Sequence, residues 1–129
     1  MELLLKTIDI LVADDEPHVV RALSFIFTRE GFIVETASDG EEALAKCREL
    51  NPRIIFLDLI MPKMDGVQLC RHVKGDSVLM PPYIIILTCR GQEIDKDNCL
   101  RAGANDFMTK PFSPKEVLEK VRGLLSDNR

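Results

Sequence analysis

The side chains that could do chemistry follow apolar runs of the sequence. Five polar residues stand in such positions, and they offer carboxylate, hydroxyl and ammonium groups: Asp14, Asp15, Asp58, Thr88 and Lys110. The run ahead of Asp58 is short and wholly apolar, which predicts a strand buried on both faces. In an open parallel sheet, ligands bind at the edge where the strands end. We therefore expect these five side chains to meet at one edge of a sheet.

Three carboxylates at one edge need a positive partner. Acidic groups that crowd together cannot all stay ionised unless a cation lies between them. Mg²⁺ is usually held by one or two carboxylates together with waters and phosphate oxygens, and Mn²⁺ favours similar ligands. Such a site suits phosphoryl transfer, in which catalysis is mainly positioning and charge neutralisation, and an aspartate can itself be the nucleophile. The pattern therefore indicates a magnesium-dependent phosphoryl site.

Apolar segments and helical patterns alternate along the chain and would position these residues. The predicted strands are 8–13, 32–37, 54–58, 83–88 and 105–108. Apolar residues recur at helical spacing in segments that begin near Pro17, Ser38 or Asp39, Val67, Gln92 and Ser113. The last of these opens with a capping box, Ser113-Pro114-Lys115-Glu116. The alternation predicts an α/β fold, a doubly wound five-stranded parallel sheet with helices on both faces.

Composition restricts the class of protein. The chain has 129 residues, of which 29% are charged and 46% hydrophobic, and this suits one domain over residues 1–129. Its net charge of −4 argues against non-specific binding to nucleic acid or to a membrane surface. No apolar run approaches the ~20 residues of a membrane span, and no signal peptide is evident, so we expect a cytoplasmic protein. The four cysteines lack metal-binding spacing and are expected to be free thiols.

In these features the chain resembles the receiver domains of two-component response regulators. The resemblance covers roughly residues 8–125. It rests on motifs that follow one another in order along the chain: Asp14-Asp15, Asp58 with Met61-Pro62 and Asp65-Gly66, Thr88, Gly103-Ala104, and Lys110-Pro111-Phe112. The resemblance implies a flavodoxin-like receiver fold and a phosphorylation-activated signalling role rather than that of an enzyme with a separate substrate. Whether such a receiver acts alone or within a larger regulator stays open.

The resemblance also assigns roles around the phosphorylated residue. Asp58 would accept a phosphoryl group from the phosphohistidine of a sensor histidine kinase or a phosphotransfer protein. Asp14, Asp15 and Asp58 would hold Mg²⁺, and the backbone carbonyl of Ile60 would complete the protein ligands. Ile60 and Arg90 would flank the phosphoryl group, where a branched apolar side chain and a long guanidinium exclude water. We therefore expect a longer-lived aspartyl-phosphate than in relatives with a short polar residue and an acid at these positions.

The resemblance also implies residues that would respond to phosphorylation of Asp58. Lys110 and Thr88 would bind phosphoryl oxygens, Phe107 would change rotamer with Thr88 on activation, and the Lys110–Pro111 peptide bond would be cis. The surface of residues 91–122 would then move, and in many DNA-binding relatives it forms a homodimer. Two pairs could bridge such a dimer, Lys96 with Glu116 and Asp106 with Lys120, but Arg101 and Arg122 would oppose each other, so the sequence does not decide it.

Three other readings compete with this one. A small phosphatase or hydrolase would need a general base, and no histidine or further acid is evidently placed for that role. A nucleotide or flavin binder would need a glycine-rich phosphate loop, and none follows a strand. An interaction domain that is never phosphorylated would not need the acids, Thr88 and Lys110 together. Individual residues also have purely structural alternatives, such as helix capping by Asp14 or Asp15 and simple packing of Phe107.

Overall fold

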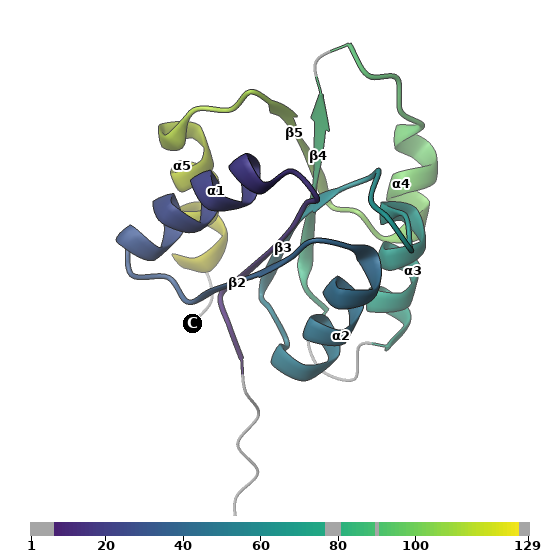
Figure 1. Cartoon of the computed structure of the whole chain (residues 1–129), viewed down its shortest axis with the longest axis horizontal. Helices are drawn as coiled ribbons and strands as arrows, with labels where there is room; N and C mark the ends of the chain where they lie inside the picture. The colour runs from purple at the N-terminus through teal and green to yellow at the C-terminus, as the bar shows by residue number, and fades with distance from the viewer. Residues whose placement is uncertain (1–6, 77–80, 90, 127–129) are drawn as a thin grey trace, which may run out of the picture.

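Five parallel strands form one sheet in the computed structural model, which describes residues 7–76, 81–89 and 91–126. The strand order is β2-β1-β3-β4-β5, with β1 at Ile10–Ala13, β2 at Val34–Ala37, β3 at Ile54–Asp58, β4 at Tyr83–Cys89 and β5 at Asp106–Lys110. The helices are α1 (Pro17–Arg29), α2 (Gly40–Leu50), α3 (Gly66–Asp76), α4 (Lys96–Ala102) and α5 (Pro114–Ser126). Helices α1 and α5 cover one face of the sheet, and α2, α3 and α4 cover the other (Figure 1). The predicted doubly wound, flavodoxin-like fold is confirmed.

Successive residues of β3 pack into different cores. Ile54 and Phe56 pack with α1 and α5, and the Phe56 ring centroid lies 5.3 Å from that of Phe27 in α1. Ile55 and Leu57 pack with the three helices of the opposite face. Burial of each such side chain contributes roughly 2 kcal/mol. The run is apolar at every position because both faces of the strand are covered.

Local capping explains where the helices begin. The Asp39 side chain accepts a hydrogen bond from the Glu42 N–H at the start of α2. The Ser113 hydroxyl accepts one from the Glu116 N–H at 3.0 Å, as the capping-box pattern predicts. The predicted start of the fourth helix at Gln92 is wrong. Helix α4 begins at Lys96, because the side chain of Asp95 caps it by accepting from the Asn98 N–H.

The loop between β3 and α3 rests on the beginning of α2. The Gly40 N–H donates to the Pro62 carbonyl at 3.2 Å, and Lys63 Nζ lies 3.6 Å from Asp39 Oδ2. A Cβ atom on Gly40 would lie 2.2 Å from the Met64 carbonyl oxygen. Only glycine leaves room for this close approach, so α2 holds in place the loop that follows Asp58.

Two further expectations concern the whole chain. All four cysteines are free, and Cys47, Cys70 and Cys99 are buried while Cys89 is exposed. In the described parts of the chain, none of the helices has the length and apolar character needed to cross a membrane.

Candidate functional site

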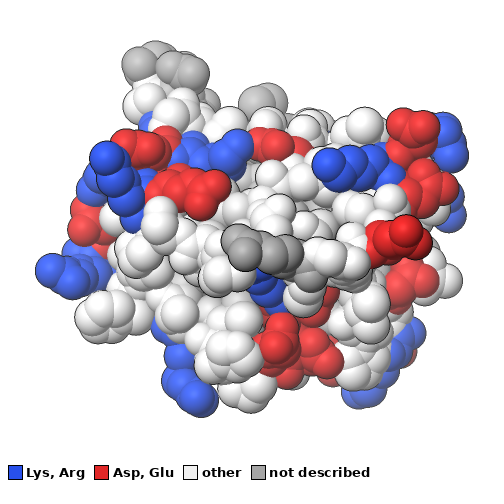
Figure 2. Space-filling model, turned by 90° about the horizontal axis from the view of Figure 1, so that it is seen from above, with Lys and Arg blue, Asp and Glu red and all other residues white. Residues whose placement is uncertain are grey.

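The strand ends bring the predicted residues to one edge of the sheet. Asp58 is the last residue of β3 and pairs with Leu87, directly before Thr88 in β4, while Lys110 ends β5 opposite Cys89. Asp14 follows directly after β1, the strand beside β3. Seen from this end of the molecule, acidic and basic side chains lie in several groups among uncharged ones (Figure 2).

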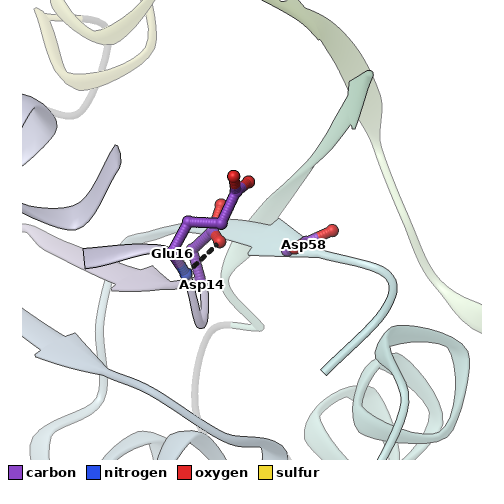
Figure 3. Close-up of side chains that lie close together, drawn as sticks. All are labelled: Asp14, Glu16 and Asp58. Atoms are coloured by element: carbon purple, nitrogen blue, oxygen red, sulfur yellow. Dashed lines mark hydrogen bonds between the residues drawn. The ribbon is translucent and has the colours of Figure 1, made fainter. Parts of the chain in front are cut away.

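Three carboxylates come together at this edge. Asp14, Glu16 and Asp58 each offer an oxygen, and these oxygens lie within 4.8 Å of one another (Figure 3). Asp14 is fully buried and Asp58 is 9% exposed. Two backbone N–H groups orient the buried acids: Glu16 N–H donates to Asp14 Oδ1 at 2.9 Å, and Ile60 N–H donates to Asp58 Oδ1 at 3.3 Å. The cluster is therefore held by the ends of β1 and β3.

The ammonium group of Lys110 neutralises part of this charge. Its Nζ lies 2.7 Å from Asp14 Oδ2, 2.8 Å from Glu16 Oε1 and 3.9 Å from Asp58 Oδ2. Burial alone would lower the pKa of Lys110, but the contacts with Asp14 and Glu16 outweigh it and the pKa is raised. Lys110 is therefore a permanent cation that lies closer to the two acids after β1 than to Asp58.

The carboxyl group of Asp58 is harder to ionise than an ordinary aspartate. Burial and, after it, the charge of Asp14 raise its pKa from 3.8 to about 6, although the charge of Lys110 acts to lower it. Asp58 is therefore mostly ionised at neutral pH, but at a cost in free energy that a bound cation would relieve.

The donor set fits a hard divalent cation. Asp14 Oδ2 is buried and receives no hydrogen bond of good geometry, although the ammonium group of Lys110 is close to it. The neighbouring ligand atoms are all carboxylate oxygens, which Mg²⁺ and Mn²⁺ prefer. The buried carboxylates of Asp14 and Asp58 can therefore take part in holding a metal ion.

Other predicted site residues lie around this cluster. Asp15 is exposed and, within the described part of the chain, falls outside the group of close carboxylates, although its charge contributes to the raised pKa of Asp58. Thr88 is buried at the end of β4. The side chain of Ile60 is 69% exposed. Arg90 lies outside the described residues, so the expected effect of Ile60 and Arg90 on phosphoryl lifetime stays a prediction.

Of the two predicted switch residues, Thr88 lies on β4 and Phe107 on β5. Phe107 is partly buried against the core formed with α2, α3 and α4, and Lys96 Nζ lies 5.3 Å from its ring centroid. The Lys110–Pro111 peptide bond is cis, the form that the resemblance implies. Lys120 makes an ion pair with Asp106 of its own chain, and a dimer that used this pair would have to exchange it.

Glu16 is the residue of this cluster that sequence reasoning missed. Its signal was present, because it follows Asp14 and Asp15 in a run of three acids. Nothing in the run indicates which acid turns toward Lys110, since that depends on how the chain leaves β1 and enters α1.

A family model decides what these features belong to. The model described as "Response regulator receiver domain" matches residues 10–122. The chain belongs to the response regulator receiver domains. The five parallel strands, the acids at their carboxyl ends and the lysine at the end of β5 agree with this family assignment.

Named relatives of this receiver domain are transcriptional regulators. It is 45% identical over 116 residues to the alkaline phosphatase synthesis transcriptional regulatory protein PhoP of Bacillus subtilis, covering 90% of this chain and 48% of PhoP. It is 39% identical to the DNA-binding response regulator MtrA of Mycolicibacterium smegmatis, covering 92% of this chain and 51% of MtrA. The receiver domain thus spans about half the length of these relatives, whose regulatory character agrees with a signalling role.

Solved structures share the fold along nearly the whole receiver domain. The Francisella response regulator 1452 receiver domain is 29% identical, with a TM-score of 0.81, and the match covers 95% of this chain and 100% of that one. The Vibrio cholerae chemotaxis protein CheY4 is 30% identical, with a TM-score of 0.81, and the match covers 92% and 98% of the two chains. The receiver fold therefore applies across the described strands and helices.

Proposed function

We propose that Asp58 is the phosphoacceptor of this receiver domain and that a sensor histidine kinase or a phosphotransfer protein is the donor. The observation that carries the proposal is the position of Asp58 at the end of β3, beside the acids that follow β1 and 3.9 Å from the ammonium group of Lys110. An oxygen of the Asp58 carboxylate forms the bond to phosphorus while the phosphorus–nitrogen bond of the phosphohistidine breaks, and the imidazole leaves.

The residues around Asp58 have separate parts in this reaction. The Ile60 N–H donates to Oδ1 and holds the carboxylate in one orientation, which leaves Oδ2 for the attack. Lys110 binds the incoming phosphoryl group as a point charge, and Thr88 donates a hydrogen bond to it. Asp14, Asp15 and Asp58 would hold Mg²⁺ together with the backbone carbonyl of Ile60. A bound Mg²⁺ would neutralise charge on the carboxylates and on the phosphoryl oxygens.

Phosphorylation then shifts the receiver between two arrangements of its α4–β5–α5 surface. The phosphoryl group adds charge that Thr88 and Lys110 bind better in one arrangement, and this differential affinity moves the equilibrium. Phe107 couples Thr88 to the surface, and homodimerisation through it stays a prediction. The chemistry of the domain is limited to its own phosphorylation and dephosphorylation.

Acetyl phosphate tests the assignment of Asp58. The protein incubated with acetyl phosphate and Mg²⁺ is expected to gain the mass of one phosphoryl group, measured on the intact chain. Asp58→Asn and omission of Mg²⁺ should each abolish the gain, whereas Glu49→Gln, which removes an exposed acid from α2, should not. A wild-type chain that gains no mass would instead be an interaction domain that is never phosphorylated.

Metal binding gives a second expected result. Calorimetry should show weak binding of Mg²⁺, because the ion keeps several of its waters. Asp14→Asn should weaken that binding at least tenfold, since it removes a buried carboxylate oxygen that has no hydrogen bond of good geometry. Mn²⁺ should broaden the amide NMR signals near Asp14 and Asp58. Equal Mg²⁺ affinity in the wild type and in Asp14→Asn would place the ion elsewhere.

A further inference from the structure

The ion pair between Glu16 and Lys110 joins the beginning of α1 to the end of β5. Lys110 Nζ lies 2.8 Å from Glu16 Oε1, within hydrogen-bonding distance, but 3.9 Å from Asp58 Oδ2. An ammonium group has three hydrogens, and Asp14 and Glu16 take up its closest contacts here. These two contacts hold Nζ beside the acids that follow β1, so at least one of them has to lengthen when Lys110 moves closer to Asp58.

The two acids differ in how easily they can release Lys110. The Asp14 side chain is fully buried and is fixed by the Glu16 N–H. The Glu16 side chain is 44% exposed, and although Glu16 is the N-cap residue of α1, its side chain makes no capping hydrogen bond. Glu16 can therefore swing into water without loss of helix capping, whereas Asp14 would leave an unpaired buried charge.

We propose that Glu16 is a positioning residue that tethers Lys110 away from Asp58 until Asp58 is modified. The proposal rests on the proposed phosphorylation of Asp58. In the unmodified protein, Glu16 and Asp14 share the ammonium group. When Asp58 carries a phosphoryl group, Lys110 moves to the phosphoryl oxygens and Glu16 turns to solvent. The carboxylate of Glu16 thus competes with the phosphoryl group for one cation and makes the modified state less favourable.

A role for Glu16 as a metal ligand would have the opposite effect. Its oxygen lies within 4.8 Å of those of Asp14 and Asp58, which is also compatible with joint coordination of an ion. Loss of a ligand weakens metal binding, and binding at Asp58 that depends on the metal would weaken with it. Loss of a tether leaves metal binding nearly unchanged and strengthens the binding of a phosphoryl-like group. Glu16→Gln separates the two roles, because it removes the charge and keeps the size of the side chain.

Beryllofluoride is the probe, since it binds to an aspartate as a phosphoryl mimic in the presence of Mg²⁺. Its affinity is measured by ¹⁹F NMR at saturating Mg²⁺, and the Mg²⁺ affinity is measured separately by calorimetry. We expect Glu16→Gln and Glu16→Ala to bind beryllofluoride at least fivefold more tightly than the wild type, with Mg²⁺ affinity lowered by less than threefold. Glu49→Gln removes the same charge from the exposed surface of α2 and should change neither affinity.

The possible outcomes separate the tether from the function on which it rests. Unchanged or weaker beryllofluoride binding in both Glu16 variants would overturn the tether, and so would a tenfold loss of Mg²⁺ affinity, which would make Glu16 a metal ligand. Failure of the wild type itself to bind beryllofluoride would overturn the phosphorylation of Asp58 as well. Thermal melting of each variant shows whether the fold is intact, and Glu16→Ala tests the tether without an amide that could replace the contact.

Discussion

Asp58→Asn is expected to stabilise the protein by up to about 3 kcal/mol at pH 7.5 in the absence of divalent ions. The cause is the raised pKa of Asp58, which burial and the charge of Asp14 move from 3.8 to about 6. Each pH unit between the folded and unfolded pKa is worth about 1.4 kcal/mol. Asparagine cannot ionise, so it avoids this cost, and Lys110 keeps its contacts with Asp14 and Glu16.

The size of this effect should depend on pH in a defined direction. The folded protein holds the proton of Asp58 more tightly than the unfolded chain does. Below about pH 4 both states are protonated and ionisation of Asp58 costs the fold nothing. As the pH rises from about 4 to about 6, the wild type loses stability relative to Asp58→Asn, and above that range the difference is constant.

Urea denaturation at pH 4.5 and pH 7.5 measures this difference. Glu49→Gln removes a carboxylate from the exposed surface of α2 and should change the free energy of unfolding by less than about 0.5 kcal/mol at either pH. Mg²⁺ should reduce the difference in the free energy of unfolding between Asp58→Asn and the wild type, because it stabilises the wild type, which keeps all its carboxylates. An advantage of Asp58→Asn that is equal at both pH values would exclude ionisation of Asp58 as its cause.

Gly40→Ala is expected to destabilise the fold by on the order of 3 kcal/mol. The new Cβ would lie 2.2 Å from the Met64 carbonyl oxygen and 2.9 Å from the carbonyl carbon. These are backbone atoms, so no side-chain rotamer change can relieve the contact, and such overpacking costs 1–3 kcal/mol or more. The loop between β3 and α3 must then move away from α2, and it carries Ile60, whose N–H orients Asp58.

Gly123→Ala is the matched control, because Gly123 lies within α5 and an added Cβ would meet nothing within 4 Å. Alanine favours a helix over glycine by roughly 1 kcal/mol, so this variant should be more stable than the wild type. Urea denaturation gives both values, and the acetyl phosphate assay shows whether displacement of the loop slows phosphorylation. If Gly40→Ala proves as stable as the wild type, the close approach of Met64 is not a constraint on the fold.

Most of the fold was predictable because its signals are local. The wholly apolar run before Asp58 indicated a strand that is buried on both faces. Ser113 with Glu116 marked the start of the last helix. The beginning of α4 was not predictable from periodicity. Gln92 has the polar character of a first helical turn, but its side chain accepts from the Cys89 N–H, and the helix begins after Asp95 instead.

The sequence indicated most of the residues that form the site, but not which acid makes an ion pair with Lys110. The parallel strands place Asp58 and Lys110 at the same edge of the sheet, where the strands end. An acid that follows β1 lies at this edge too, because β1 is the neighbour of β3. Asp15 and Glu16 are neighbours of similar chemistry, yet Asp15 is exposed while Glu16 meets a lysine far along the chain. That difference depends on the direction of each side chain as the chain leaves β1, which sequence spacing does not specify.

The contact between Glu16 and Lys110 spans 94 residues and has a consequence for newly made protein. A ribosome adds the acids after β1 and then Asp58 well before it adds Lys110, so the emerging chain carries an acidic cluster without its built-in cation. The phosphoacceptor chemistry proposed for Asp58 can therefore become complete only once β5 has emerged and paired with β4. Nascent receivers that have not yet finished folding would in this way be kept out of signalling.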